Sequence, residues 1–114
     1  MPFDPREFLT LAEQLLTGTA TEGAIRTAAS RAYYAVHLRA KQSLASRRLM
    51  TPTHTGEDHM LVITTLRSRG GAEGDIIDSL RRLRIRSDYR IERAVTAVEA
   101  SRAVGLAASV YPRL

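Results

Sequence analysis

The sequence predicts an all-α fold, an antiparallel bundle of four to five helices. Apolar residues recur at three- and four-residue spacing in five successive segments, and no segment shows sustained alternation of apolar and polar residues. The connections between these segments are short, which favours antiparallel neighbours. With 114 residues, the chain has the length of one domain, whose core buries about two thirds of the unfolded surface. We therefore expect a single helical domain over residues 1–114.

The first two helices are expected over residues 4–17 and 21–48. Asp4 and Pro5 suit the start of the first helix, because an aspartate accepts hydrogen bonds from the first turn and proline needs no donor there. Gly18 is a typical residue for the end of such a helix. The second helix has a stripe of mostly small residues, which lets neighbouring helices approach closely. The stripe consists of Ile25, Ala28, Ala29, Ala32, Val36, Ala40 and Leu44.

The next segment, residues 49–55, is expected to be a loop because Pro52 interrupts any helix there. A third helix then begins behind Thr55 and ends at Gly70 and Gly71. A fourth helix is expected over residues 72–87 and a fifth over residues 90–110. The fourth turns Ile76, Ile77, Leu80 and Leu83 inward, and the fifth turns Ile91, Ala94, Val95, Val98, Val104 and Ala108 inward.

The composition excludes several kinds of site. The chain has no cysteine, so disulfides, thiolate metal sites and cysteine nucleophiles are ruled out. No apolar run approaches the roughly 18 residues of a membrane span, and the first residues lack the apolar region of a secretory signal. We therefore expect a cytoplasmic protein that does not span a membrane.

The positive charge of the chain allows two interpretations. The formal net charge is +5, and sixteen of the seventeen basic residues are arginines, with Lys41 as the exception. Arginines neutralise nucleic-acid phosphates, and they also pair with carboxylates across protein interfaces. The fourth helix is expected to carry a nucleic-acid-binding patch on its outer face, although the same residues fit a solvated face. The patch consists of Arg81, Arg82 and Arg86 together with Arg84.

Two segments resemble the HEPN superfamily (higher eukaryotes and prokaryotes nucleotide-binding). Residues 29–36 read Ala-Ser-Arg-Ala-Tyr-Tyr-Ala-Val, and residues 83–89 read Leu-Arg-Ile-Arg-Ser-Asp-Tyr. The second segment is similar to the Arg-x-x-Ala-Asp-Tyr motif of small stand-alone prokaryotic members, with Ser87 in place of alanine. His59 also fits a histidine that is frequent in that branch. The resemblance covers about residues 8–110. It implies a helical bundle that dimerises through its motif-bearing helices, and a nucleotidyltransferase-type antitoxin as partner.

The resemblance points to Arg84, Asp88 and Tyr89 as candidate catalytic residues. Many members are metal-independent ribonucleases with an Arg-x4–6-His motif, in which histidine suits proton transfer and arginine stabilises phosphate charge. No histidine follows Arg84 or Arg86 in this chain, and Tyr89 stands at the matching distance from Arg84. Tyrosine, with an ordinary pKa of about 10, is a poor base at neutral pH. The alternative is that Arg84 and Asp88 form an i,i+4 ion pair that fixes the helix end.

The second helix is expected to supply an interface as well as core. Arg31, Tyr33, Tyr34 and His37 lie beside its small-residue stripe, so we expect them at a homodimer contact. The two tyrosines fit core and interface positions better than base-stacking platforms. Arg31 and His37 match Arg-x5-His literally, but a helix turns them roughly 120° apart, so a second chain would have to complete such a site.

No metal site and no cofactor are expected. His54, Glu57, Asp58 and His59 are residue types that bind metals, but their spacing matches no closed site, and loop and helix-start roles account for them. The sequence also shows no glycine-rich phosphate loop and no serine–histidine–aspartate arrangement.

The sequence thus predicts a small HEPN-domain protein of a toxin–antitoxin or defence-type system, which binds a partner protein, with RNA as a possible second ligand. One alternative is an active metal-independent RNA endonuclease, that is, a toxin. The other is a structural dimerisation or nucleotide-binding module.

Overall fold

The structure is a computed structural model that describes residues 2–114, and it confirms the predicted all-α fold. It has five α-helices and a final 3-10 turn, with no strand among the described residues. The elements are α1 (Arg6–Leu15), α2 (Glu22–Ser46), α3 (Asp58–Ser68), α4 (Glu73–Tyr89), α5 (Ala97–Val110) and η1 (Tyr111–Arg113). None of these helices has a stretch long and apolar enough to cross a lipid bilayer.

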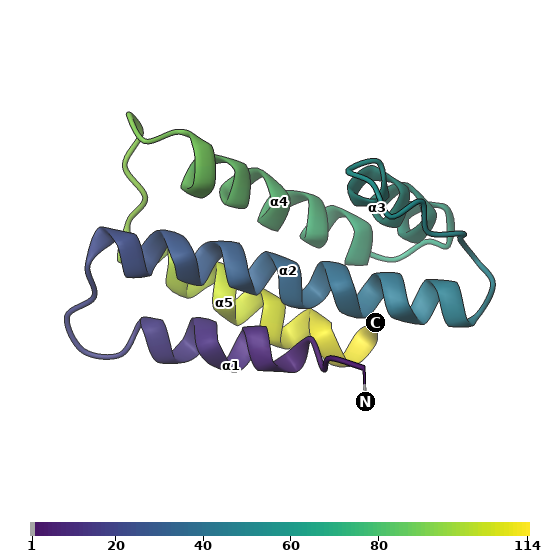
Figure 1. Ribbon diagram of the computed structural model, residues 1–114, viewed down its shortest axis with the longest axis horizontal. Coiled ribbons are helices and arrows are strands. Elements are labelled where there is room, and N and C mark those ends of the chain that lie inside the picture. The colour runs from purple at the N-terminus through teal and green to yellow at the C-terminus, as the bar shows by residue number, and fades with distance from the viewer. Residues whose placement is uncertain (1) are drawn as a thin grey trace.

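Four of the helices run along the long axis of the molecule, and α3 crosses at one end (Figure 1). The chain reverses direction between α1 and α2 and again between α4 and α5, as short connections require. The beginning and the end of the described chain lie close together. The hydroxyl of Tyr111 donates a hydrogen bond of 3.4 Å to Asp4, and the guanidinium of Arg6 lies 5.2 Å from the Tyr111 ring centre.

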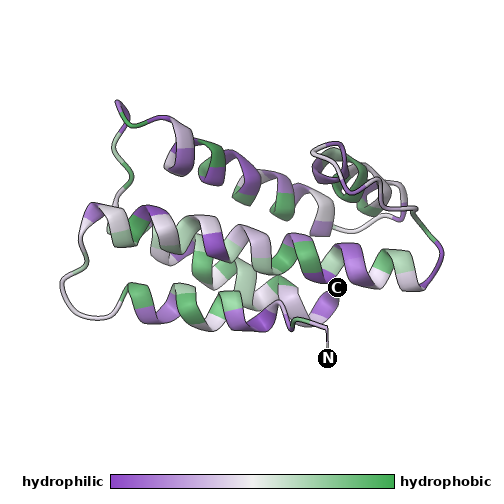
Figure 2. Cartoon of the chain, viewed as in Figure 1, coloured by the Kyte–Doolittle hydropathy of each residue, from purple (hydrophilic) through white to green (hydrophobic). Residues whose placement is uncertain are grey.

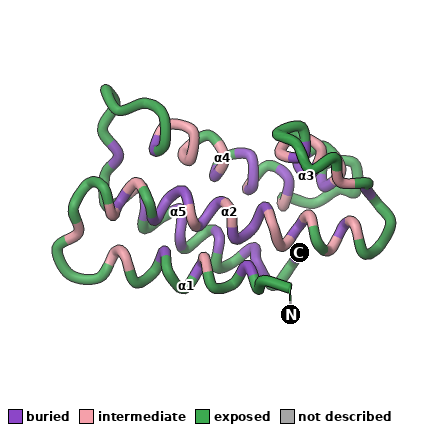
Figure 3. The backbone as a smooth tube through the Cα atoms, in the orientation of Figure 1, coloured by how far each residue is buried: buried purple, intermediate pink, exposed green. Residues whose placement is uncertain are grey.

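Helix α2 lies at the centre of the bundle and packs against α1, α3, α4 and α5. Figure 3 shows buried positions on α2, α4 and α5, whereas most positions in the loops are exposed. Hydrophobic and hydrophilic residues accordingly alternate along the helices in Figure 2. The predicted small-residue stripe is confirmed as core, because Ala28, Ala29, Ala32, Val36, Ala40 and Leu44 are all buried.

The helix ends lie close to their predicted positions. Asp4 accepts a 3.0 Å hydrogen bond from the Arg6 N–H, which satisfies a donor of the first turn of α1. At the end of α2, Arg48 adopts a left-handed conformation with φ of 59°, and the Leu49 N–H bonds the Leu44 carbonyl at 2.9 Å. This backbone pattern closes the last turn of a helix, and it ends α2 two residues before the predicted position.

A buried carboxylate fixes the connection between α2 and α3. The only lysine, Lys41, places its Nζ 2.7 Å from Asp58, whose side chain also accepts hydrogen bonds from Thr53 and from the His54 N–H. These donors, Lys41 foremost, hold the pKa of Asp58 well below its usual range. The carboxylate therefore stays ionised, and it fixes the first turn of α3, where His59 follows.

The predicted start of the fifth helix at residue 90 is wrong. Residues 90–96 form a loop, and α5 begins at Ala97. Ile91 is 85% exposed, and Ala94, Val98 and Ala108 are exposed as well, so these four residues do not belong to the core. The cause of the later start is a capping box, in which the Thr96 hydroxyl accepts from the Glu99 N–H and the Glu99 carboxylate accepts from the Thr96 N–H.

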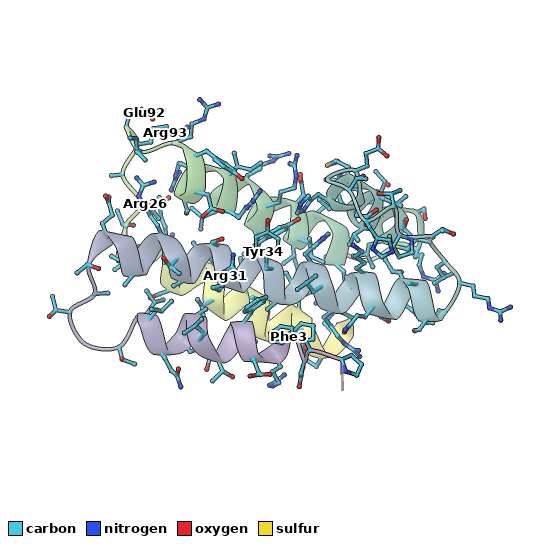
Figure 4. The ribbon with its side chains drawn as sticks, in the orientation of Figure 1. Phe3, Arg26, Arg31, Tyr34, Glu92 and Arg93 are labelled. Carbon is cyan, nitrogen blue, oxygen red and sulfur yellow. The ribbon has the colours of Figure 1, made fainter. Side chains whose placement is uncertain are left out.

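The side chain of Arg26 binds this loop to α2. Its guanidinium donates to the carbonyls of Arg86 at 3.1 Å, Ser87 at 3.0 Å and Arg90 at 3.3 Å, and also to that of Arg93. Figure 4 shows Arg26 near the first turns of α2, with Arg93 on the loop above it. The two α4 carbonyls lie in the last turn, where a helix runs short of N–H donors for its carbonyls, so Arg26 both caps α4 and shapes the loop.

We expect Arg26→Ala to destabilise the fold markedly, because four carbonyls would lose a charged donor. The expected loss is roughly 2–3 kcal/mol in the free energy of unfolding, or about 10 °C in Tm. Thermal unfolding followed by circular dichroism measures it. Arg69→Ala, at an exposed arginine after α3, is the matched control and should change little. Equal Tm values for both variants would contradict the capping role.

Candidate functional site

The arginines of α4 point to two different sides of the helix. Arg84 turns toward α2 and is 14% exposed at its side chain, whereas Arg86 turns toward α5, pairs with Glu99, and is 23% exposed. Successive residues are rotated by about 100° on a helix, so positions 84 and 86 cannot share a face. The prediction that Arg81, Arg82, Arg84 and Arg86 form one outer face is therefore wrong.

The three predicted catalytic residues meet at the end of α4. The Nε of Arg84 lies 2.9 Å from Oδ2 of Asp88, and the same oxygen accepts a 3.1 Å hydrogen bond from the buried Ser30 hydroxyl of α2. The Nη2 of Arg84 donates to the Tyr89 hydroxyl at 3.3 Å. The i,i+4 ion pair that was the structural alternative for Arg84 and Asp88 is thus present, and it also ties α4 to α2.

Aromatic rings and guanidiniums alternate across three helices at this place. The Arg31 guanidinium lies 4.8 Å from the ring centre of Phe8 and 4.9 Å from that of Tyr34. Arg84 lies 5.0 Å from the Tyr34 ring and 5.2 Å from the Tyr89 ring. We call the five residues the cation–π ladder. Its last member, Tyr89, is 65% exposed, so one end of the ladder is open to a ligand.

Two of the four predicted interface residues are core residues. Tyr33 is fully buried and His37 is 4% exposed, so neither side chain reaches a surface that a second chain could touch. The prediction placed both at an interface because they follow the small-residue stripe, but α3 and α4 cover that side of α2. Arg31 and Tyr34 are half-buried in the ladder and remain available.

The rings of Tyr33 and His37 on α2 and of His59 on α3 form a cluster that joins the two helices. The Tyr33 hydroxyl lies 2.5 Å from Nδ1 of His59, and the His37 and His59 rings stack with centres 4.5 Å apart. His59 was not among the predicted site residues. Its resemblance to a frequent family histidine was the only signal in the sequence, since its proximity to α2 and α4 follows from packing between distant segments.

Both histidines are neutral at pH 7. Burial, followed by His59 and Lys41, lowers the pKa of His37 to about 4. Burial, followed by the charges of Arg84 and Arg81, also lowers the pKa of His59. Two neutral rings can stack without repulsion, which explains how the pair is tolerated next to the arginines.

The hydrogen bond of Tyr33 sets the tautomer of His59. Burial raises the pKa of Tyr33, so its hydroxyl keeps its proton, and within residues 2–114 it has no acceptor other than Nδ1 of His59. The hydroxyl therefore donates, and the imidazole proton of the neutral ring lies on Nε2. His59 thus offers an N–H donor within range of the charges of Arg81 and Arg84, a combination that suits the oxygens of a phosphate group.

The residues considered for a metal are engaged otherwise or stand apart. Asp58 is taken up by Lys41 and Thr53, and Nδ1 of His59 is taken up by Tyr33. His54 is exposed in the loop before α3, where its φ is 59°. In the described part of the chain no three His, Asp or Glu side chains converge as metal ligands do.

Comparison with known proteins identifies the family. The sequence model of the HEPN domain matches residues 6–113, which is nearly the whole chain. The chain therefore belongs to the HEPN domain family, as the two motifs indicated. No curated protein and no solved structure matches the chain significantly.

We expect His37 to make the fold sensitive to acid. Its pKa in the folded state is about 4, below the unfolded value of about 6.5, so protons bind the unfolded chain more tightly. The stabilisation is complete above about pH 6.5 and is lost as the pH falls toward 4, by roughly 2–3 kcal/mol. Urea unfolding between pH 7 and 4 should show a shallower decline for His37→Phe, which keeps a ring. Parallel profiles would contradict this role.

Proposed function

We propose that this member of the HEPN family acts in a toxin–antitoxin or defence-type system, as a single domain that binds a partner protein and RNA but cuts RNA slowly or not at all. The observation that carries the proposal is the set of donors at the junction of α2, α3 and α4. Arg84 and His59 both lie against the Tyr34 ring, at 5.0 and 6.0 Å from its centre, and the charge of Arg81 also acts on His59. Together they offer cationic and N–H donors without a base among them.

RNA binding is supported by the surroundings of Arg84. Asp88 is the carboxylate that pairs with Arg84, and a phosphate oxygen can take its place because both are anionic acceptors of the same donor. Beside it, the exposed ring of Tyr89 offers a surface for a nucleobase, and stacking on an aromatic side chain is tolerant of sequence. The Arg84 guanidinium lies 5.2 Å from the Tyr89 ring centre, so the site offers contacts for a phosphate and for a neighbouring base.

Slow or absent cutting is expected because no side chain at this site is free to accept a proton. A metal-independent ribonuclease needs a group that removes the 2′-hydroxyl proton. The Nδ1 lone pair of His59 is occupied by the Tyr33 hydroxyl, and His37 is buried. Tyr89 is at the position where family nucleases have histidine, and its hydroxyl already accepts from Arg84. None of these groups is a ready base at pH 7.

An active endonuclease is the second candidate, and one observation favours it. His59 is neutral at pH 7 and lies where the charges of Arg84 and Arg81 act on it, which is the environment that a general base needs. If a bound substrate reverses the tautomer, Nε2 becomes the base, and Arg84 stabilises the phosphate. The Tyr33 hydroxyl oxygen would then accept a hydrogen bond from the Nδ1–H of His59.

A homodimer is part of the proposal, and α1 together with α2 supplies its surface. Phe3 and Leu11 are exposed, and Phe3 packs on Phe8, the first member of the cation–π ladder. The ladder leads from there to Arg31 and Tyr34, so apolar and cationic side chains form one continuous strip. Exposed strips of this kind mark association sites.

We expect the protein to sediment at about twice the chain mass of 12.6 kDa at micromolar concentration. Leu11→Arg places a charge in the strip and should shift the equilibrium toward the monomer. Leu49→Arg is the control, since Leu49 is exposed on the loop after α2. A parent protein that sediments as a monomer would refute the dimer, and dissociation by both variants would refute this surface.

We expect purified protein to bind single-stranded RNA and to leave it largely intact in the presence of a chelator. Fluorescence anisotropy should show an affinity that falls steeply with salt, because phosphate contacts release counterions. Arg84→Ala should weaken binding about tenfold, and His59→Gln less, with Arg69→Ala as control. Gel analysis of mixed RNA substrates measures the cutting.

The same assay separates the candidate functions. Robust cutting by the parent that is lost in both Arg84→Ala and His59→Gln would make the protein a nuclease and reject the leading proposal. Failure to bind RNA at any salt concentration would leave a dimerisation module. Melting curves of each variant show whether a loss of binding reflects unfolding, since Arg84 also ties α4 to α2.

A further inference from the structure

A second cationic surface lies on the other side of α4. A groove of about 400 Å³ runs between α4 and α5, and the loop that joins them closes one end. Four arginines from these three segments line it, namely Arg82 and Arg86 of α4, Arg93 of the loop and Arg102 of α5. It shares none of its lining residues with the cluster around Arg84.

The groove has an excess of positive charge. Glu99 is the one carboxylate among its lining residues, and it is held by Arg86 and by the Thr96 cap at the start of α5. Arg82 pairs with Asp78 at 2.8 Å yet stays largely exposed. Arg93 and Arg102 form no ion pair within the described part of the chain. Two of the four arginines of the groove, Arg93 and Arg102, therefore lack an acidic partner among residues 2–114.

The backbone that carries the arginines is held in place before any ligand arrives. Arg26 binds the backbone carbonyl of Arg93, and the capping box fixes the first turn of α5. Arg82 and Arg86 are one helical turn apart, so they project from the same side of α4. Such preorganisation lowers the conformational entropy that the protein loses when a ligand binds.

The floor of the groove is apolar and contains no aromatic ring. Leu83 is half-buried and Leu106 is an exposed large hydrophobic residue, and both line the groove together with the arginines. An RNA strand would find no stacking platform here and would leave the leucines uncovered. A protein segment with apolar residues on one side and carboxylates on its flanks would cover the leucines and pair with the arginines.

We propose that the groove between α4 and α5 binds an acidic amphipathic helix of a partner protein. The inference rests on the partner-binding part of the proposed function and adds the surface and the chemistry of the partner. The apolar side of the helix packs on Leu83 and Leu106, and its glutamates or aspartates pair with Arg82, Arg93 and Arg102. RNA is left to the opposite side of α4, where the aromatic rings lie.

The probe is a fluorescein-labelled peptide of about 16 residues, with leucines at i, i+3, i+4 and i+7 and glutamates on both flanks. We expect saturable binding with a Kd below about 100 µM. Amide shifts in NMR spectra should centre on α4, α5 and the loop near Arg93. The double variant Arg93→Gln, Arg102→Gln should weaken binding about tenfold, and Leu106→Ser should weaken it severalfold. The three substituted residues are exposed, so both variants should keep the fold.

The controls decide between occupants and separate this inference from the proposed function. The doubly substituted Arg47→Gln, Arg69→Gln protein has the same change of net charge away from the groove and should bind as the parent does. A peptide with the same composition in scrambled order should bind weakly. Equal binding of both peptides, no saturable binding, or shifts outside the groove would overturn the inference. RNA binding that depends on Arg93 and Arg102 rather than on Arg84 would contradict the inference and assign the groove to nucleic acid. If the protein binds RNA through Arg84 but does not bind the peptide, the inference fails and the proposed RNA site is unaffected.

Discussion

Because α2 is covered by neighbours on most of its surface, its side chains determine how closely every other helix can approach. Ala28, Ala32 and Ala35 are fully buried, and side chains of this size let α1, α4 and α5 pack closely around one axis. Larger groups, Tyr33 and His37, occur where α2 faces α3 and α4. Helix α3 packs on these rings through His59, and the Lys41–Asp58 pair ties its first turn to α2. The candidate site is therefore the place where the small-residue packing of α2 is interrupted.

The position of the site among large side chains explains why Arg84 has both a structural and a proposed functional role. Its guanidinium packs between the rings of Tyr34 and Tyr89 while it pairs with Asp88. The ring contacts orient the group, and they do not depend on which anion it faces. An incoming phosphate would replace one carboxylate contact and leave the stacking intact, so the exchange costs much less than exposing a buried charge. A side chain fixed by packing but paired with a partly exposed anion suits a binding site.

The sequence was sufficient for the fold because the features that define α1 to α4 are local. Apolar spacing, a first-turn proline and glycines at the ends lie within the segments themselves. The start of α5 was mispredicted because Ile91, Ala94 and Val95 continue a helical spacing, whereas Arg26, more than sixty positions earlier, holds residues 90 and 93 in a loop. The Thr96-x-x-Glu99 pattern was a local signal for the true start. The cluster of Arg84, Asp88 and Tyr89 followed from motif resemblance, but the contribution of His59 and the burial of Tyr33 depend on contacts between distant segments, which periodicity does not show.

The two sides of α4 carry different chemistry for a geometric reason. Arg84 and Asp88 are one turn apart on the side with the aromatic rings, and Arg82 and Arg86 are one turn apart on the side with Leu106. Ligands on the two sides therefore need not compete for space. Their charges still interact across the helix, although solvent screens exposed charges within about 8–10 Å at physiological salt. The remaining route between the sides is the last turn of α4, where Arg26 binds the carbonyls of Arg86 and Ser87. The Arg26 guanidinium contacts both the end of α4 and the loop that carries Arg93, so it is one element through which a mechanical change at one surface would reach the other.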